Sequence, residues 1–474
     1  MSKNNRHMLA LLFVGAAALL SAAPAISHAQ SADVAQDVTA QTQAVSAQEG
    51  RAVRRTRDGK VETYSTFAAG EEISFSWAAE TGVRTAYVKW YAQPDYAILV
   101  QSDESGAELA RQTLETPAYN DCYGILPQAR SLSISSESGM QIAEITFYSE
   151  GALPEGVYDW EQPVDKADLL VVSAHCDDEL IFFGGTIPYY AGERGLAVQV
   201  VYMANGSRTR VDEALEGLWH AGVRNAPVFL PFQDAYTESL RLALIRWGEQ
   251  ETIGALVSLI RRFQPEVIVS HDLDGEYGHG AHMATAYCML AAVPLAADGT
   301  AFPDTAAAYG VWQTQKLYLH LYPENRITMD WSRPLAAFDG KTALEVANEA
   351  YHRHVSQLEY HSDVYGDGEY SSLEYGLAYT AVGTDAAKDD FFEHVDPARL
   401  SGYIAPAPEP AETAASAAPA ATPAASAAPE PAAQETDHGG IPAWLPGGAL
   451  ALLAVLAAVA LIYARRRKRP KTGV

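Results

Sequence analysis

Apolar residues recur along this chain with two different spacings, and the change between them divides the sequence. From about residue 56 to residue 156 they alternate with polar residues, as at positions 73–77 and 143–147, and turn residues separate the runs. A succession of short strands over ~100 residues is typical of two antiparallel sheets packed face to face. We therefore predict a small β-sandwich domain at residues 56–156.

Residues 165–400 have a different pattern, in which continuous apolar runs alternate with amphipathic stretches. The runs that predict buried strands are residues 169–174, 198–203 and 266–270. The stretches that predict helices are residues 179–191, 211–221 and 240–263. This alternation predicts an α/β domain with a Rossmann-like, layered, mostly parallel sheet flanked by helices. Ligands of such sheets bind beyond the carboxyl ends of the strands.

The N-terminal end has the features of an export signal. Residues 1–29 contain basic residues, an apolar stretch and a small-x-small cleavage site, and we interpret them as a signal peptide rather than a spanning helix. Residues 30–55 are rich in Ala, Gln and Ser, which predicts a flexible leader.

The C-terminal end predicts a membrane anchor. Residues 404–440 form an Ala/Pro-rich linker, and residues 441–464 are 24 residues without a charge, enough to cross a bilayer of ~30 Å. The basic tail at residues 465–474 should remain in the cytoplasm. We expect a single-pass protein of the cell membrane whose domains lie outside the cytoplasm.

The formal charge of the chain is −26. Such a field repels nucleic acid and anionic polymers and favours neutral or cationic partners. The three cysteines, at 122, 176 and 288, are odd in number and widely spaced, which does not indicate a disulfide framework.

Histidines and carboxylates follow two of the predicted strands directly. His175, Asp177 and Asp178 come after the strand at 169–174, and His271 opens a second polar run after the strand at 266–270. Buried charges must be paired or must bind a metal. The two strand ends therefore predict a mononuclear metal site, and the protein is expected to be a metal-dependent hydrolase.

Five motifs carry a resemblance to a known family. They are His175-Cys176-Asp177-Asp178-Glu179, Gly184-Gly185-Thr186, Arg210-Val211-Asp212-Glu213, Tyr277-Gly278-His279-Gly280-Ala281-His282 and His354-Val355-Ser356-Gln357. In this order, over residues 165–400, they resemble the PIG-L (LmbE-like) family of zinc-dependent N-acetylglucosaminyl deacetylases. The chain departs from the family at Cys176, where Pro is usual, and at Gly280-Ala281, where Pro-Asp is usual.

The resemblance implies that His175, Asp178 and His282 bind Zn²⁺, although Fe²⁺ accepts the same ligands. Asp177 and Asp178 are adjacent in a tight turn, so their side chains should diverge. Asp177 is then free to act as general base toward a water activated by the metal.

Three further residues complete the predicted site. His279 lies three residues before His282 and is expected to protonate the departing amine. The resemblance implies that Tyr277 donates a hydrogen bond to the oxyanion. Arg210 is expected to bind a sugar hydroxyl or the acetyl product, and an ion pair with Glu213 remains an alternative.

Several other side chains have a structural and a functional interpretation. Asp234 is expected to cap a helix beginning near Thr237 rather than to bind substrate, and Cys176 to be a small side chain in the turn rather than a ligand. Residues expected to support the metal ligands or begin a helix are His271, Asp272 and Glu179. Aromatic residues expected in the β-domain core, with a sugar platform as the alternative, are Trp90, Tyr91 and Tyr96.

Together these observations predict a membrane-anchored, extracytoplasmic, zinc-dependent de-N-acetylase of an N-acetylglucosamine-type sugar or glycan. A zinc amidase of the same fold acting on another small amide conjugate is one alternative. A non-catalytic surface glycan-binding protein is another, and acetate release with and without a chelator would separate these functions.

Overall fold

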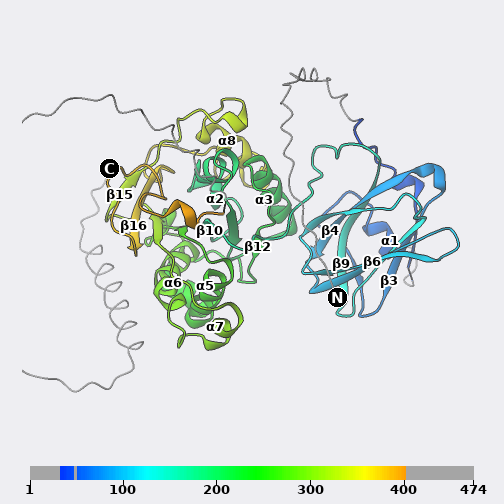
Figure 1. Ribbon diagram of the computed structural model, residues 1–474, viewed down its shortest axis with the longest axis horizontal. Coiled ribbons are helices and arrows are strands. Elements are labelled where there is room, and N and C mark those ends of the chain that lie inside the picture. Colours follow the sequence, from blue (N-terminus) through cyan, green and yellow to red (C-terminus); the bar gives the residue numbers. More distant parts are fainter. Residues whose placement is uncertain (1–32, 47–50, 402–474) are drawn as a thin grey trace, which may run out of the picture.

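Two groups of secondary-structure elements follow one another in the computed structural model, which describes residues 33–46 and 51–401 (Figure 1). The first group consists mainly of strands and ends at Ser149, and the second alternates strands and helices from Leu169 onward. The change of hydrophobic spacing along the sequence therefore coincides with a change of architecture, from a strand-rich region to an α/β region.

Nine strands of the first group form two antiparallel sheets. The five-stranded sheet has the order β1 (Gln43–Ser46), β3 (Glu72–Ser76), β8 (Ser131–Ser135), β5 (Tyr96–Ser102), β6 (Glu108–Glu115). The four-stranded sheet has the order β2 (Ser65–Phe67), β9 (Met140–Ser149), β4 (Val83–Ala92), β7 (Asn120–Gly124). A short helix, α1 (Arg51–Arg55), lies near the start of this domain.

One hydrophobic cluster takes side chains from both sheets. Phe75 of β3 and Leu132 of β8 contribute from one sheet, and Trp90 of β4 and Phe147 of β9 contribute from the other. Because successive side chains of a strand point to opposite faces, every second residue of β8 is buried. Trp90 is completely buried, as expected for a core residue, whereas Tyr91 and Tyr96 are half-buried.

Part of the predicted flexible leader, residues 30–55, is paired in the sheet. β1 pairs with β3 in antiparallel register, and Val34 and Asp37 form bridges to Ala152 and Tyr148. The expectation of a flexible segment is therefore wrong for residues 33–46, because their backbone groups find partners at an otherwise open sheet edge.

A seven-stranded sheet forms the centre of the second domain. Its order is β12 (Val228–Phe229), β11 (Val198–Tyr202), β10 (Leu169–Ser173), β13 (Val267–Ser270), β14 (Lys316–His320), β16 (Glu374–Thr380), β15 (Arg326–Thr328). The first five strands are parallel, and β16 and β15 add an antiparallel edge. The sheet is thus mixed, with the parallel part that the βα alternation predicts.

Helices cover both faces of this sheet (Figure 1). They are α2 (Asp178–Ile181), α3 (Arg208–His220), α4 (Leu240–Trp247), α5 (Glu249–Phe263), α6 (Gly280–Ala296), α7 (Pro303–Tyr309) and α8 (Ala343–Tyr351). Leu169 and Val171 of β10 pack into the cluster that contains α3 and α8, and the alternate residues Leu170 and Val172 pack into the cluster with α5 and α6. Burial on both faces explains why β10 is continuously apolar in sequence.

Two predicted helices are interrupted. Residues 179–191 do not form one helix, because α2 ends at Ile181 and a separate π-helical segment occupies Pro188–Glu193. Gly184 between them has φ +48, and Gly185 lies so close to Trp331 that a Cβ there would meet the ring at 2.7 Å. The stretch at 240–263 is divided at Gly248, whose φ of +78 is not helical.

Some predicted segments lie outside the described residues. They are the signal peptide (1–29), the linker (404–440), the transmembrane helix (441–464) and the basic tail (465–474). Within residues 33–46 and 51–401, no helix combines the length and the apolar character needed to cross a bilayer.

Candidate active site

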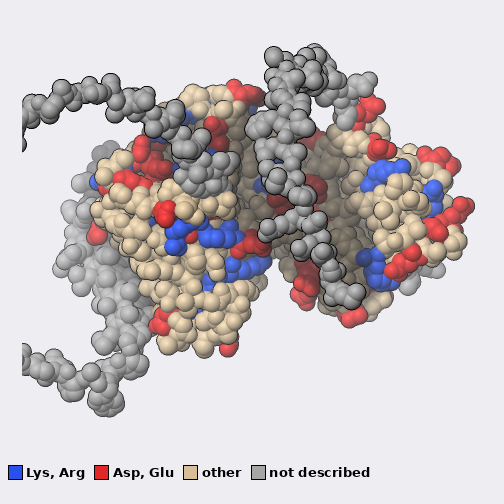
Figure 2. All heavy atoms as spheres, viewed as in Figure 1, with Lys and Arg blue, Asp and Glu red and all other residues tan. Residues whose placement is uncertain are grey.

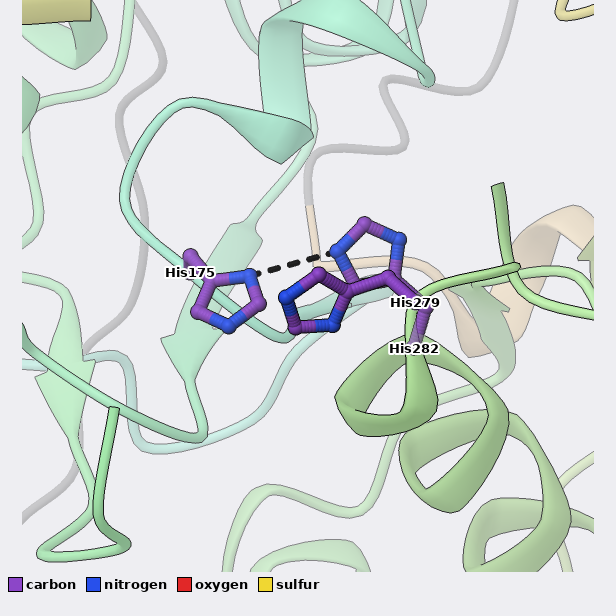
Figure 3. Close-up of side chains that lie close together, drawn as sticks. All are labelled: His175, His279 and His282. Atoms are coloured by element: carbon purple, nitrogen blue, oxygen red, sulfur yellow. Dashed lines mark hydrogen bonds between the residues drawn. The ribbon is translucent and has the colours of Figure 1, made fainter. Parts of the chain in front are cut away.

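The candidate metal ligands come from the loop after β10 and from the start of α6, at the carboxyl end of the parallel strands (Figure 3). His175 lies two residues after the end of β10, and Asp178 begins α2 two residues after Cys176. His279 is the N-cap residue of α6, and His282 lies in its first turn. Two groups of side chains could each hold a metal ion, and His282 belongs to both. The first group adds His175 and His279, and the second adds Asp178 and His271.

The donor atoms of His175, Asp178 and His282 form a compact triangle. His175 Nδ1 lies 2.9 Å from Asp178 Oδ2, and His282 Nε2 lies 3.2 Å from each of these two atoms. Tetrahedral zinc with bonds of ~2.0–2.1 Å separates its ligands by about 3.3 Å. All three side chains are buried, and the set of two nitrogens and one oxygen suits a divalent ion. The residues therefore fit a metal in the arrangement that the motifs predicted.

Next to the triangle, the buried carboxylate of Glu276 contacts the side chains of three histidines. Glu276 Oε2 lies 2.7 Å from His282 Nδ1 and 2.9 Å from His271 Nδ1, and its Oε1 lies 2.7 Å from His320 Nδ1. A carboxylate that accepts the second nitrogen of a metal-binding histidine fixes its tautomer and orientation. Burial opposes ionisation of Glu276, but the surrounding histidines, His271 first, lower its pKa well below the usual value.

The hydrogen bonds around Glu276 fix where the protons are. The backbone N–H of Ala174 donates to His271 Nε2, so the proton of a neutral His271 is on Nδ1 and points to Glu276. His320 differs, because its Nε2 faces the carbonyl of Ser371 at 3.0 Å, which can only accept. Both ring nitrogens of His320 therefore face oxygen atoms, one of Glu276 and one of Ser371.

The predicted base, Asp177, lines the same pocket as the triangle of ligands but does not belong to the triangle. Its Oδ1 accepts from Arg210 Nη2 at 2.6 Å, and its backbone N–H donates to Glu179 Oε2. Burial raises the pKa of Asp177, and the guanidinium of Arg210 opposes that shift. The φ of Asp177 is +131, a strained conformation for a residue with a side chain. Asp177 and Asp178 therefore diverge as expected.

Arg210 has partners that the sequence did not suggest. It binds Asp177 and the carbonyl of Cys176 rather than Glu213, so the alternative of an Arg210–Glu213 pair is wrong. Glu213 instead accepts hydrogen bonds from the backbone and hydroxyl of Ser356. Helix α3 therefore joins the Arg-x-x-Glu and His-x-Ser-Gln motifs through this contact.

The expectation that Asp234 caps a helix is also wrong. Helix α4 begins at Leu240, and Ser239 is its N-cap residue. The Asp234 side chain lies 3.4 Å from Arg210 Nη1 and 3.6 Å from His175 Nε2. It therefore belongs to the wall of the site.

His279 is placed as a hydrogen-bond donor. Its Nδ1 accepts from the backbone N–H of Ala281 at 3.2 Å, which leaves the proton of the neutral ring on Nε2. Burial and the neighbouring His282 lower the pKa of His279 to about 3. At neutral pH the ring is uncharged, which differs from the proton-donating imidazolium expected from sequence.

Tyr277 lies beside these histidines in a left-handed conformation with φ +46. Its ring centre is 5.4 Å from that of His282. Desolvation in the pocket, with the carboxylates of Asp178 and Asp177, raises its pKa, so the hydroxyl stays protonated although 51% of the residue is exposed. It is available as a donor to a bound molecule.

Both departures from the family pattern have a local structural reason. The buried thiol of Cys176 donates to the carbonyl of Asn205 at 3.5 Å, as expected of a small side chain in the turn. Gly280 donates its N–H to the carbonyl of Thr237, and a Cβ at Gly280 would lie 2.2 Å from Thr237 Oγ1. Proline has no N–H and would not fit there.

These side chains line an open pocket of ≈ 390 Å³. Its lining includes the predicted residues His175, Asp177, Asp178, Arg210, Tyr277 and His279, together with Asp234, Tyr236, Gln357, Tyr360 and His361. The walls combine aromatic rings with carboxylate, imidazole and guanidinium groups.

Sequence reasoning missed Glu276 and His320. A signal existed for His320, because it ends the apolar strand β14 as His175 and His271 follow β10 and β13. His354 is completely buried 3.7 Å from Glu179, and neither ring nitrogen has a hydrogen-bond partner in the part of the chain that the structure describes. Burial raises the pKa of Glu179 to about 7.

Comparison with known proteins identifies the domain. A curated relative from Mycobacterium leprae, 1D-myo-inositol 2-acetamido-2-deoxy-alpha-D-glucopyranoside deacetylase, is 31% identical over 185 residues, covering 32% of this chain and 59% of its own length. The relative of the same name from Rhodococcus erythropolis is 32% identical, again over 32% of this chain and 59% of its own. The chain therefore spans about three-fifths of the length of these relatives.

A solved structure, N,N'-diacetylchitobiose deacetylase from Pyrococcus horikoshii, is similar at 20% identity and a TM-score of 0.33, covering 42% of this chain and 74% of that one. The family described as "PIG-L: GlcNAc-PI de-N-acetylase" matches residues 170–293, which contain β10, β13, the start of α6 and all three candidate metal ligands. Residues 170–293 of this chain are therefore a PIG-L family domain.

Proposed function

We propose that this protein is a metal-dependent deacetylase that hydrolyses the acetamide of an N-acetylglucosamine-type sugar or glycan. The observation that carries the proposal is the triangle of His175, Asp178 and His282 donor atoms beside a carboxylate, Asp177, that is not part of it. We propose Zn²⁺ as the ion. Bound there, it would polarise the acetamide carbonyl and lower the pKa of a water molecule.

Asp177 supplies the base. Its carboxylate takes one proton from the attacking water as the water oxygen bonds to the carbonyl carbon. Arg210 holds Oδ1 at 2.6 Å and so fixes the direction of the carboxylate. The raised pKa of Asp177 matters at this step, because a base with a higher pKa accepts and keeps the proton more readily.

The oxyanion can accept hydrogen bonds from two other residues that line the pocket. The Nε2–H of neutral His279 and the hydroxyl of Tyr277 both line the pocket and can donate to the developing negative charge. When the C–N bond breaks, the amine needs a proton. Asp177, which has just received one, is better supplied for this step than His279, whose pKa of about 3 leaves the ring uncharged at neutral pH.

The substrate class rests on the relatives and on the pocket. The relatives from M. leprae and R. erythropolis are named for deacetylation of a 2-acetamido-2-deoxy-glucopyranoside. A pocket of ≈ 390 Å³ with aromatic and polar walls has room for one such sugar. We propose in addition that the protein is exported and anchored by residues 441–464, with the catalytic domain outside the cytoplasm, because these residues are apolar and a basic tail follows. The nine-stranded domain would then be an accessory β-sandwich.

The test compares two neighbouring variants in the full chain. Asp177→Asn keeps the shape of the side chain but cannot accept a proton, so bound zinc should stay while acetate release falls by ~10²–10⁴-fold. Asp178→Asn removes an anionic ligand, so both zinc and activity should fall, and added zinc should restore part of the activity. Acetate release from N-acetylglucosamine and bound zinc are measured over a range of added zinc. Equal zinc loss in the two variants would mean that Asp177 is a ligand, and no acetate release by the wild-type protein with zinc would overturn the proposal.

A further inference from the structure

A second pocket lies where the strand-rich domain meets the α/β domain. It measures ≈ 290 Å³. Glu62, Tyr91 and Tyr119 line it from the first domain, and Asn205, Ser207 and Arg208 line it from the loop before α3 and from the start of that helix. We call it the interdomain pocket.

The turn at residues 205–207 lines the interdomain pocket and lies close to side chains of the active site. Gly206 lines the interdomain pocket, and a Cβ on it would lie 3.0 Å from Asp234 Oδ2 and 3.2 Å from Arg210 Cδ. Asp234 and Arg210 both line the active-site pocket. The two pockets are therefore neighbours near this turn.

The contact between the domains is fixed by buried polar groups, so the pocket has defined walls. Asp212 of α3 accepts from Lys89 Nζ at 2.8 Å and from Asn120 Nδ2 at 2.6 Å. Arg208, with 6% of its surface exposed, donates from Nε to the carbonyl of Trp90. These bonds connect α3, which carries Arg210, with strands β4 and β7.

The lining groups are those that recognise a pyranose ring. Tyr91 stacks on Tyr64 with ring centres 3.8 Å apart, which fixes its orientation, and Tyr119 is anchored by a hydrogen bond from Asn205 Nδ2. Rigid aromatic rings bind the C–H faces of a sugar, and carboxylate, amide and hydroxyl groups bind its hydroxyls. Glu62 supplies the carboxylate, and a hydrogen bond from Thr209 lowers its pKa, so it is ionised.

Charge restricts the ligand further. The chain carries −26, and acidic side chains are spread over both domains on the face shown in Figure 2. Glu62 in the pocket adds a negative group, whereas Arg208 is already engaged by Trp90 and Asn120. An uncharged sugar is therefore favoured over one that carries carboxylate or sulfate.

We propose that the interdomain pocket is a second glycan subsite, which binds a neutral hexopyranose linked to the sugar whose acetamide is hydrolysed. This inference rests on the proposed deacetylase function for the first sugar. It makes the substrate an oligosaccharide or polysaccharide rather than a single sugar, and it gives the strand-rich domain a direct part in substrate binding.

The experiment measures substrate length preference in the zinc-loaded full chain. kcat/KM for acetate release is determined with N-acetylglucosamine and with N,N′,N″-triacetylchitotriose. The trisaccharide should be preferred by about tenfold or more, since an additional stacked ring adds about 1.4 kcal/mol. Tyr91→Ala should remove most of this preference, and Glu62→Gln, which keeps size and shape, should reduce it. Tyr96→Ala is the matched control, because Tyr96 is also half-buried in the strand-rich domain but does not line the pocket.

The outcomes separate this inference from the proposed function. The second subsite is overturned if the wild type shows no preference for the trisaccharide. It is also overturned if that preference is unchanged in both Tyr91→Ala and Glu62→Gln. If the wild type hydrolyses neither compound, the proposed function fails, and calorimetric titration with the trisaccharide decides the subsite by itself. Binding that Tyr91→Ala weakens and Tyr96→Ala does not supports the subsite, and absence of binding overturns it.

Discussion

Replacement of Glu276 by glutamine removes one negative charge from the centre of the site and almost no volume. In the wild type, Oε2 accepts from His282 and His271, and Oε1 faces Nδ1 of His320. The amide oxygen of the introduced glutamine would replace Oε2, since two Nδ1–H groups require an acceptor there. The amide NH₂ would then face His320 Nδ1. The hydrogen bonds to Oε2 survive this exchange, whereas the carboxylate charge is lost, together with the bond that Oε1 accepts from the backbone N–H of Asp272.

The expected effect is therefore on the metal rather than on the fold. His282 keeps its tautomer but donates to a neutral oxygen, so its Nε2 becomes a weaker ligand. Loss of a group that supports a metal-binding histidine typically costs 10–100-fold in metal affinity, or about 1.4–2.7 kcal/mol. Glu276→Ala differs, because it leaves the Nδ1 atoms of three buried histidines, His282, His271 and His320, without their partner. A buried polar group left without a hydrogen-bond partner costs about 1–3 kcal/mol of folding stability.

Zinc affinity is measured by competition with a chromophoric chelator, and the free energy of unfolding of the metal-free protein by urea titration. Glu266→Gln is the matched control. Glu266 is also completely buried, and it lies just before strand β13, which Glu276 follows. It pairs with Lys166 and Arg399 instead of the histidines. The Glu266→Gln variant should have a lower free energy of unfolding and an unchanged zinc affinity. Wild-type affinity in Glu276→Gln, or an equal loss of affinity in Glu266→Gln, would refute the reasoning.

Three further predictions concern pH, packing and placement. Burial opposes the charged form of His282, but the neighbouring carboxylates raise its pKa to about 10. A metal must displace that proton, so zinc affinity should rise with pH by about tenfold per unit below that pKa, and a chelator titration that gives a flat profile would contradict this. Gly280→Ala should lower the free energy of unfolding by about 1–3 kcal/mol, because the new Cβ overlaps Thr237, and urea titration will measure the loss. Deletion of residues 441–474 should release active enzyme from the membrane fraction, and folded but inactive protein would show that the anchor contributes to the site.

Much of the fold and part of the candidate site follow from local pattern. Strands β10 and β13 are continuous apolar runs, and the polar residues after them lie at the carboxyl ends of parallel strands whatever the rest of the chain does. The strand ends thus predicted a metal site at this edge of the sheet, whereas the choice of His175, Asp178 and His282 as its ligands came from the resemblance of the motifs. The divergence of Asp177 from Asp178 was predictable too, since it depends only on their adjacency in a turn.

Other contacts depended on which segments became neighbours. His320 reaches Glu276 because β14 is placed next to β13, and the partner of Arg210 is set by the position of α3 beside the β10 loop. Asp234 is of a residue type that often caps helices, yet the fold of its loop places it beside His175 and Arg210 in the pocket wall.

The sequence by itself determined the two periodicities, the strand ends and the residue types of the metal site, because these depend on side-chain spacing within single elements. The tertiary structure decided the protonation and partners of the buried histidines and the formation of an interdomain pocket. Those properties arise from side chains that are distant in sequence and share a low-dielectric interior, where each group's charge and hydrogen bonds are set by the groups placed around it.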